Sequence, residues 1–112
     1  MLPVKEIVSA QINKEIECLK KALNEANEGK ARVCARRAAG LAVNFWLLKN
    51  NITSSDISAA VCLNKIKEYD NLPDPVIEAA EKLTAKVNML EAGSITLDPL
   101  KESLILIDYF LS

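Results

Sequence analysis

Apolar residues recur at helical spacing throughout this 112-residue chain, and this spacing limits the possible folds more than any other feature. In the first segment they follow one another at steps of three or four, which places them on one stripe of an amphipathic helix. The stripe consists of Val4, Val8, Ile12, Ile16, Leu19, Leu23 and Ala26. Pro3 fits the first turn of this helix, and Gly29 fits a break or a cap at its C-terminal end.

The second segment, from about Lys30 to Lys49, is apolar on more than one side of a helix. One broad face holds Ala31, Cys34, Ala35, Ala38, Leu41, Ala42 and Phe45. Val33, Val43 and Leu47 lie on a second side, at about 100° of rotation per residue. A helix with two apolar sides is a central helix or one that also forms a subunit contact. Its small alanine side chains predict that a neighbouring helix approaches closely.

A loop follows at residues 50–55, where Ser54 or Ser55 suits the N-cap of a short third helix near residues 56–69. The apolar side of this helix holds Ala59, Cys62, Ile66 and Tyr69. Residues 70–73 then end it.

Asp-Pro pairs mark the starts of two further helices, at residues 74–75 and 98–99. In each pair Asp suits the N-cap and Pro the first helical position, where its missing N–H is not needed. The fourth helix carries Val76, Ala80, Leu83, Val87 and Leu90 and stops at Gly93, and the fifth carries Leu100, Leu104, Ile107 and Leu111. No segment has the two-residue period of a strand. We therefore predict an all-α fold, a bundle of about five helices with a four-helix up-down core, as one domain over residues 1–112.

The cysteines and the hydropathy pattern favour a protein of the cytoplasm. The chain has three cysteines, which are Cys18, Cys34 and Cys62. This odd number and the absence of a Cys-x-x-Cys motif favour reduced thiols. Each lies in an apolar pattern and is interpreted as a small buried side chain. The N-terminal charges do not fit a signal peptide, and the longest uncharged run, residues 38–48, is too short to cross a bilayer. No membrane association is expected.

The chain contains no histidine, which removes the commonest general base and the commonest transition-metal ligand. It also lacks a glycine-rich phosphate loop. Asp70 and Asp74 flank the loop before the fourth helix, and Glu78, Glu81 and Glu91 fall off its apolar stripe and are interpreted as a solvated face. We expect no metal and no cofactor, and the absence of a catalytic motif argues against an enzyme.

Charge is distributed unevenly, although the net charge is only −1. Residues 29–50 contain five basic residues and no acidic one, whereas residues 51–112 contain five lysines and ten acidic residues. A domain that binds nucleic acid is usually basic as a whole, and this chain is not.

Three interpretations are open for the basic residues that begin the second segment, which are Lys30, Arg32, Arg36 and Arg37. A positive patch near a helix N-terminus can bind an anion such as phosphate, a nucleotide or an RNA backbone. The arginines can instead pair with acids of the C-terminal half. They can also form a homodimer surface with Val33, Val43 and Leu47, since Arg is enriched at interfaces. No aromatic residue alternates with the basic ones, which argues against stacking on single-stranded nucleic acid. Phe45 and Trp46, two to three turns away, are interpreted as core residues.

Residues 24–48 resemble the second helix of HEPN (higher-eukaryote and prokaryote nucleotide-binding) domains, in which a Gly is followed by small and basic residues and an apolar helix end. The loop and short helix that follow also resemble those of HEPN domains. The same is true of the segment at residues 72–83, LPDPVIEAAEKL, and of the last helix after it. The likeness covers about residues 20–112. It implies a helical bundle that commonly dimerises, in toxin–antitoxin, nucleotidyltransferase-partner or RNA-processing systems. The ribonuclease members use an Arg followed by a His, and this chain has no His, so that active site is not carried over.

The function expected from the sequence is that of a small non-catalytic bundle that forms a homodimer and binds a protein partner or an anionic ligand. Its binding residues are expected at Lys30, Arg32, Arg36 and Arg37. The alternative is an enzyme that processes RNA or nucleotides and uses the arginines with carboxylates. Binding of nucleic acid or nucleotide is not favoured.

Overall fold

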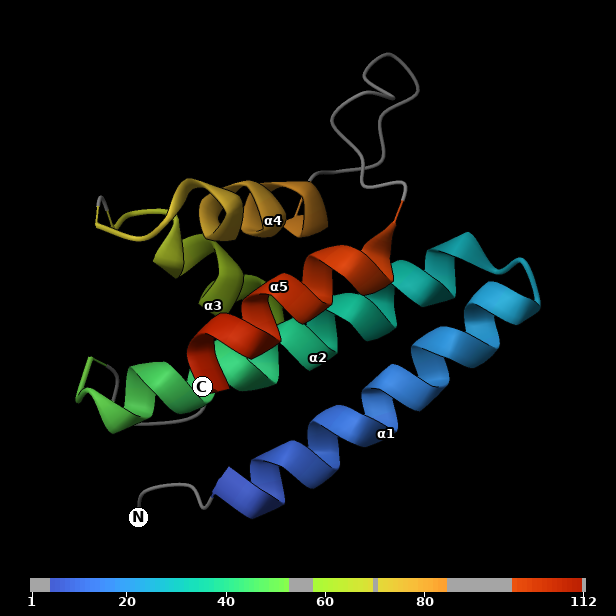
Figure 1. Ribbon diagram of the computed structural model, residues 1–112, viewed down its shortest axis with the longest axis horizontal. Helices are drawn as coiled ribbons and strands as arrows, with labels where there is room; N and C mark the ends of the chain where they lie inside the picture. The colour runs from blue at the N-terminus through green and yellow to red at the C-terminus, as the bar shows by residue number, and fades with distance from the viewer. Residues whose placement is uncertain (1–4, 53–57, 70, 85–97, 112) are drawn as a thin grey trace.

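A computed structural model of the chain describes residues 5–52, 58–69, 71–84 and 98–111. Every regular element in these residues is a helix. The helices are α1 (Lys5–Asn24), α2 (Glu28–Lys49), α3 (Ala59–Ile66), α4 (Asp74–Thr84) and α5 (Pro99–Leu111). The predicted all-α bundle of about five helices is confirmed (Figure 1).

The central helix is α2, which contacts each of the other four. It runs antiparallel to α1 and parallel to α5, and α4 packs on α5 in the opposite direction (Figure 1). The short α3 packs against α2 and α4. Direction therefore alternates along the chain through α1, α2, α4 and α5, as in an up-down core. The two helices in the middle of the packing, α2 and α5, nevertheless run the same way (Figure 1).

Small residues on several sides of α2 allow the other helices to pack closely around it. Its buried residues include Ala31, Ala35, Ala38, Ala39, Gly40 and Ala42. A Cβ built on Gly40 would lie 2.5 Å from the Cβ of Ala59 in α3, which confirms the close helix approach predicted from the sequence. Val43 and Leu47 are both fully buried, so neither is available for the dimer surface to which the sequence assigned them. Four helices pack around α2, and they cover Val43 and Leu47 on its second apolar side.

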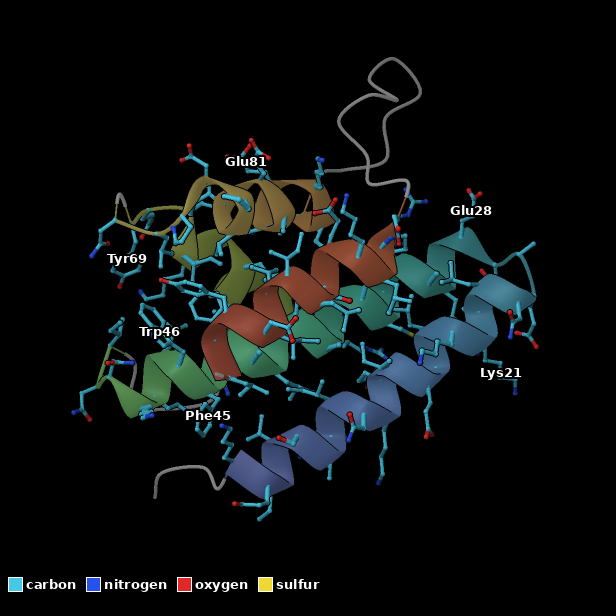
Figure 2. The ribbon with its side chains drawn as sticks, viewed as in Figure 1. Lys21, Glu28, Phe45, Trp46, Tyr69 and Glu81 are labelled. Atoms are coloured by element: carbon cyan, nitrogen blue, oxygen red, sulfur yellow. The ribbon has the colours of Figure 1, made fainter. Side chains whose placement is uncertain are left out.

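Aromatic side chains join the C-terminal ends of α2 and α5. The ring of Trp46 lies 5.1 Å from that of Phe110 and 5.9 Å from that of Tyr69, measured between centroids. Phe45 is 9% exposed, and Trp46 packs against the core while remaining half-buried (Figure 2). Both therefore belong to the core, as the sequence indicated.

The end of α1 differs from the prediction. Ala26, and not Gly29, adopts the left-handed conformation that ends the helix, with a φ of 57°. The N–H of Asn27 donates to the carbonyl of Ala22 at 2.8 Å, and that of Ala26 to Leu23 at 3.1 Å. These are the two bonds of a Schellman motif. Gly29 instead lies in the first turn of α2.

The end of α2 uses the same motif, and α3 begins later than expected. Asn51 has a φ of 57°, and the N–H of Ile52 donates to the carbonyl of Leu47 at 2.9 Å. The N-cap of α3 is Ser58, whose hydroxyl accepts from the N–H of Val61 at 3.3 Å. The expected caps Ser54 and Ser55 lie outside the described residues.

The predicted start of α5 is confirmed, because the side chain of Asp98 accepts from the N–H of Lys101 at 3.0 Å. At α4 the helix starts one residue early, at Asp74, and the carbonyl of Pro73 accepts the first helical bonds.

The predicted stripes of α1, α3 and α4 are largely buried, although Leu23 of α1 is 40% exposed, and the stripe predicted for α5 is not buried. Val8, Ile12 and Leu19 in α1, Cys62 and Ile66 in α3, and Val76, Ala80 and Leu83 in α4 are buried. In α5 the buried side chains are Glu102, Ser103, Leu106 and Phe110, whereas Leu104 is 40% exposed. The predicted residues Pro3, Val4, Asp70, Val87, Leu90 and Gly93 lie outside the described part.

Candidate functional site

The four predicted binding residues occupy the first turns of α2. Asn27 caps this helix, and its side-chain oxygen accepts a hydrogen bond from the N–H of Lys30 at 3.1 Å. Negative charge is favoured at a helix N-terminus, and Glu28 supplies it (Figure 2). Basic residues so close to this end oppose the helix dipole. Their presence is therefore not explained by the stability of α2.

The basic residues form two pairs on either side of Val33. At about 100° per residue, Lys30 and Arg37 share one edge of α2, and Arg32 and Arg36 share another. Lys30 and Arg37 are exposed, whereas Arg32 and Arg36 are half-buried. The Nε of Arg36 donates to the carbonyl of Arg32 at 3.4 Å. Val33 lies between the pairs and is 38% exposed. We call these five residues the basic face.

No side chain of the basic face forms an ion pair within the described residues. Where an ion pair does form there, it joins Lys82 of α4 to Glu102 of α5, at 3.6 Å between Nζ and Oε1. Pairing of the arginines with acids of the C-terminal half is therefore not observed in the part of the chain that the structure describes. No ion pair within the described residues therefore neutralises the positive charge of the basic face.

A groove of about 230 Å³ continues from the basic face along α2. Its residues are Glu15 of α1, Arg37, Gly40, Leu41 and Asn44 of α2, and Ala59 of α3. The groove exists because α2 is flanked by α1 on one side and by the short α3 on the other. Arg37 thus belongs both to the basic face and to this groove, and the other three basic residues do not line it.

An acidic surface lies on the outer side of α4. Asp74, Glu78 and Glu81 are all exposed and follow one another at steps of four and three, so they share one edge of the helix. Glu81 points away from the bundle (Figure 2). Glu78 and Glu81 are exposed as expected from the sequence, and Glu91 lies outside the described residues. We call Asp74, Glu78 and Glu81 the acidic face.

Glu102 is a charged residue that the sequence did not single out. It is 7% exposed and pairs with Lys82 of α4. The side chain of Lys82 is 48% exposed, so the pair sits at the edge of the core. At about 100° per residue, Glu102 lies on the side of α5 opposite the predicted apolar stripe, so the sequence pattern gave no signal of its burial.

Two cysteines also meet, at the seam between α1 and α2. The thiol of Cys34 donates to the sulfur of Cys18, with 2.8 Å between the two sulfur atoms. Burial, the hydrogen bond with Cys18 and the negative charges of Cys18 and Glu15 raise the pKa of Cys34 to about 11, and Arg37 opposes this rise. None of the three cysteines forms a disulfide, and Cys34 and Cys62 are buried as expected, whereas Cys18 is only half-buried.

Among the described residues, no three His, Cys, Asp or Glu side chains converge as metal ligands. No helix described here is both long and apolar enough to cross a membrane.

Comparison of the chain with protein-family models, with curated proteins and with solved structures found no match.

Proposed function

We propose that this protein is a non-catalytic binding module that forms a homodimer, in which the basic face of one copy contacts the acidic face of the other. The observation that supports it is the basic face itself, whose positive side chains form no ion pair among the described residues. Arginine at an interface presents a planar group with several N–H donors to carboxylates.

The two faces match in length and in sign. Lys30 and Arg37 are seven residues apart on α2, and Asp74 and Glu81 are seven apart on α4. At 1.5 Å per residue each face extends about 10 Å along its helix. A two-fold axis would use each contact twice, so that both basic faces are neutralised in one closed dimer.

Val33 supports an interface over a site for a small anion. Its apolar side chain is exposed at the centre of the basic face, where it contributes nothing to the binding of phosphate. At a protein interface it would be covered, with the charged residues forming the rim. The resemblance to HEPN domains remains a prediction, and it agrees with a dimer because those domains commonly dimerise.

Charge reversal tests the proposal. Lys30→Glu with Arg37→Glu changes two exposed residues of the basic face, and we expect light scattering to show a monomer where the unmodified chain shows a dimer. Lys14→Glu with Lys20→Glu is the matched control, since both lysines are exposed on α1 and the charge change is equal. We expect this control to remain a dimer.

The same variants separate the homodimer from an RNA-processing or nucleotide-processing function. If the basic-face variant remains a dimer but loses binding of a labelled RNA oligonucleotide or of ATP at low salt, the proposal is wrong and the alternative gains its support. A monomeric unmodified chain at the highest soluble concentration would also refute the dimer.

A further inference from the structure

The register of the α1–α2 hairpin places Cys18 and Cys34 opposite each other. The turn between the helices is centred on Ala26, so residues equally distant from it along the chain face one another across the seam. Glu15 and Arg37 both line the groove described above. Each lies about one helical turn further from the hairpin connection than the neighbouring cysteine. The groove shared by Glu15 and Arg37 agrees with the register given by the contact between the two cysteines.

The two sulfur atoms differ in access to solvent. Cys34 is 1% exposed, whereas Cys18 is half-buried on α1. The third cysteine, Cys62, is fully buried in α3 and donates to the side-chain oxygen of Asn44 at a long 3.9 Å. A small reagent therefore reaches Cys18 before it reaches either of the other thiols.

We propose that Cys18 and Cys34 form a two-thiol oxidation site that reduces a hydroperoxide and becomes a disulfide between α1 and α2. This site is independent of the proposed dimer contact. It takes the chemical class of small hydroperoxides, of which hydrogen peroxide is the simplest.

The reaction has two steps. The Cys18 thiolate attacks one peroxide oxygen, the O–O bond breaks, and the second oxygen leaves as water or an alcohol after taking up a proton. Cys18 is then a sulfenic acid. The sulfur of Cys34 attacks the sulfur of Cys18, the S–O bond breaks, and the hydroxyl leaves as water with the proton of Cys34. Two thiols have lost two electrons, and one peroxide has gained them.

The geometry favours the second step over further oxidation. Cys34 already lies 2.8 Å from the sulfur that it must attack, so no helix has to move far to close the bond. The attacking sulfur is the buried one, and its pKa of about 11 keeps it protonated until Cys18 reacts. Cys18 is thus the sulfur oxidised first, and Cys34 the one that resolves it.

The cross-link would join residues 16 apart in the sequence and restrict the unfolded chain. Closing a loop of this size raises the thermal midpoint of a domain this small by about 10 °C. The disulfide should therefore be visible both chemically and as increased stability.

The test treats the reduced 112-residue chain with hydrogen peroxide, removes the peroxide, unfolds the protein and alkylates the remaining thiols. We expect one alkyl group, on Cys62, where the reduced chain takes three, and a peptide map that links residues 18 and 34. Cys62→Ala is the matched control, and it should form the same disulfide and retain no free thiol.

Cys34→Ala removes the resolving sulfur and keeps a small side chain in the core. We expect it to stop at oxidised Cys18, which a sulfenic-acid probe labels, without the rise in thermal midpoint. Three outcomes would overturn the proposal: three alkylated thiols after peroxide, a disulfide that joins two chains, or sulfinic acid at Cys18 of the unmodified protein. Circular dichroism before treatment confirms that each variant is folded.

Discussion

Ala26 and Asn51 end their helices with the same left-handed backbone, at a φ of 57° in each case. Asn tolerates this conformation because its short polar side chain can bond locally, whereas the Cβ of Ala is crowded by the following carbonyl. The cost for such a residue is about 1–2 kcal/mol. Ala26 is therefore a position at which the native conformation is strained and a glycine would fit better.

Ala26→Gly should raise the free energy of unfolding by about 1 kcal/mol, because glycine adopts a positive φ without this cost. Ala10→Gly is the matched control, since Ala10 is exposed inside α1 and glycine there should lower the free energy by about 1 kcal/mol. Urea unfolding of the two variants checks the opposite signs. If Ala26→Gly is as destabilising as the control, the helix does not end at Ala26 in this way.

The buried thiol of Cys34 predicts how stability depends on pH under reducing conditions. Its pKa is about 11 in the folded chain, against about 8.5 for an unfolded cysteine. Between these values the unfolded chain has lost a proton that the folded chain keeps, so stability decreases as pH rises. Below about pH 8 the contribution is fully present, and it is lost as pH rises through the folded pKa.

We expect Cys34→Ala to show a smaller loss of stability between about pH 9 and pH 11, by on the order of 2 kcal/mol. Urea midpoints of both proteins across this range, with a reductant present, provide the measurement. Identical pH profiles would mean that the thiol of Cys34 is accessible to solvent.

At the scale of helices, Gly40 sets the distance between α2 and α3. A Cβ at this position would lie 2.5 Å from the Cβ and 2.7 Å from the Cα of Ala59, which is closer than real contacts allow. Since the second of these atoms belongs to the backbone of α3, the side chain alone cannot move aside.

Gly40→Ala should therefore destabilise the fold by about 1–3 kcal/mol, even though alanine is the better helix former. Gly29→Ala is its control, because a Cβ there meets only the side-chain oxygen of Asn27 at 3.9 Å. We expect that variant to be neutral or slightly stabilised. Thermal unfolding of both compares them, and equal stability of the two variants would contradict the close packing of α3.

Sequence periodicity and capping residues predict most of these helices. Alternating steps of three and four identify the buried side of α1, and Asp98 marks the start of α5, because both signals depend on local geometry. The prediction fails at α5, where Leu104 is exposed and Ser103 is buried. This helix packs between α2 and α4, and the apolar residues on its flanks outnumber those in its narrow core face. Its orientation depends on tertiary packing that a single stripe does not specify.

At the scale of the whole molecule, one part of each candidate site can be predicted from the sequence, and the other part depends on tertiary packing. The basic residues of α2 are visible in the sequence as a run without acids, but whether they pair within the chain depends on which helices are neighbours. The contact between Cys18 and Cys34 follows from the position of the α1–α2 turn. The sequence prediction placed that turn at Gly29, and with this placement the two cysteines do not lie opposite each other. With the turn at Ala26, the two cysteines lie at equal distances from it along the chain.

The central claim, that the basic face of one copy contacts the acidic face of another, is tested most directly by complementation. One variant carries Lys30→Glu and Arg37→Glu, and a second carries Glu78→Lys and Glu81→Lys, all at exposed positions. Light scattering gives the mass of each variant and of their equimolar mixture. We predict a monomer of about 12.3 kDa for each variant alone and twice this mass for the mixture, in which reversed faces meet. A mixture that stays monomeric, or variants that dimerise alone as the unmodified chain does, would contradict the account.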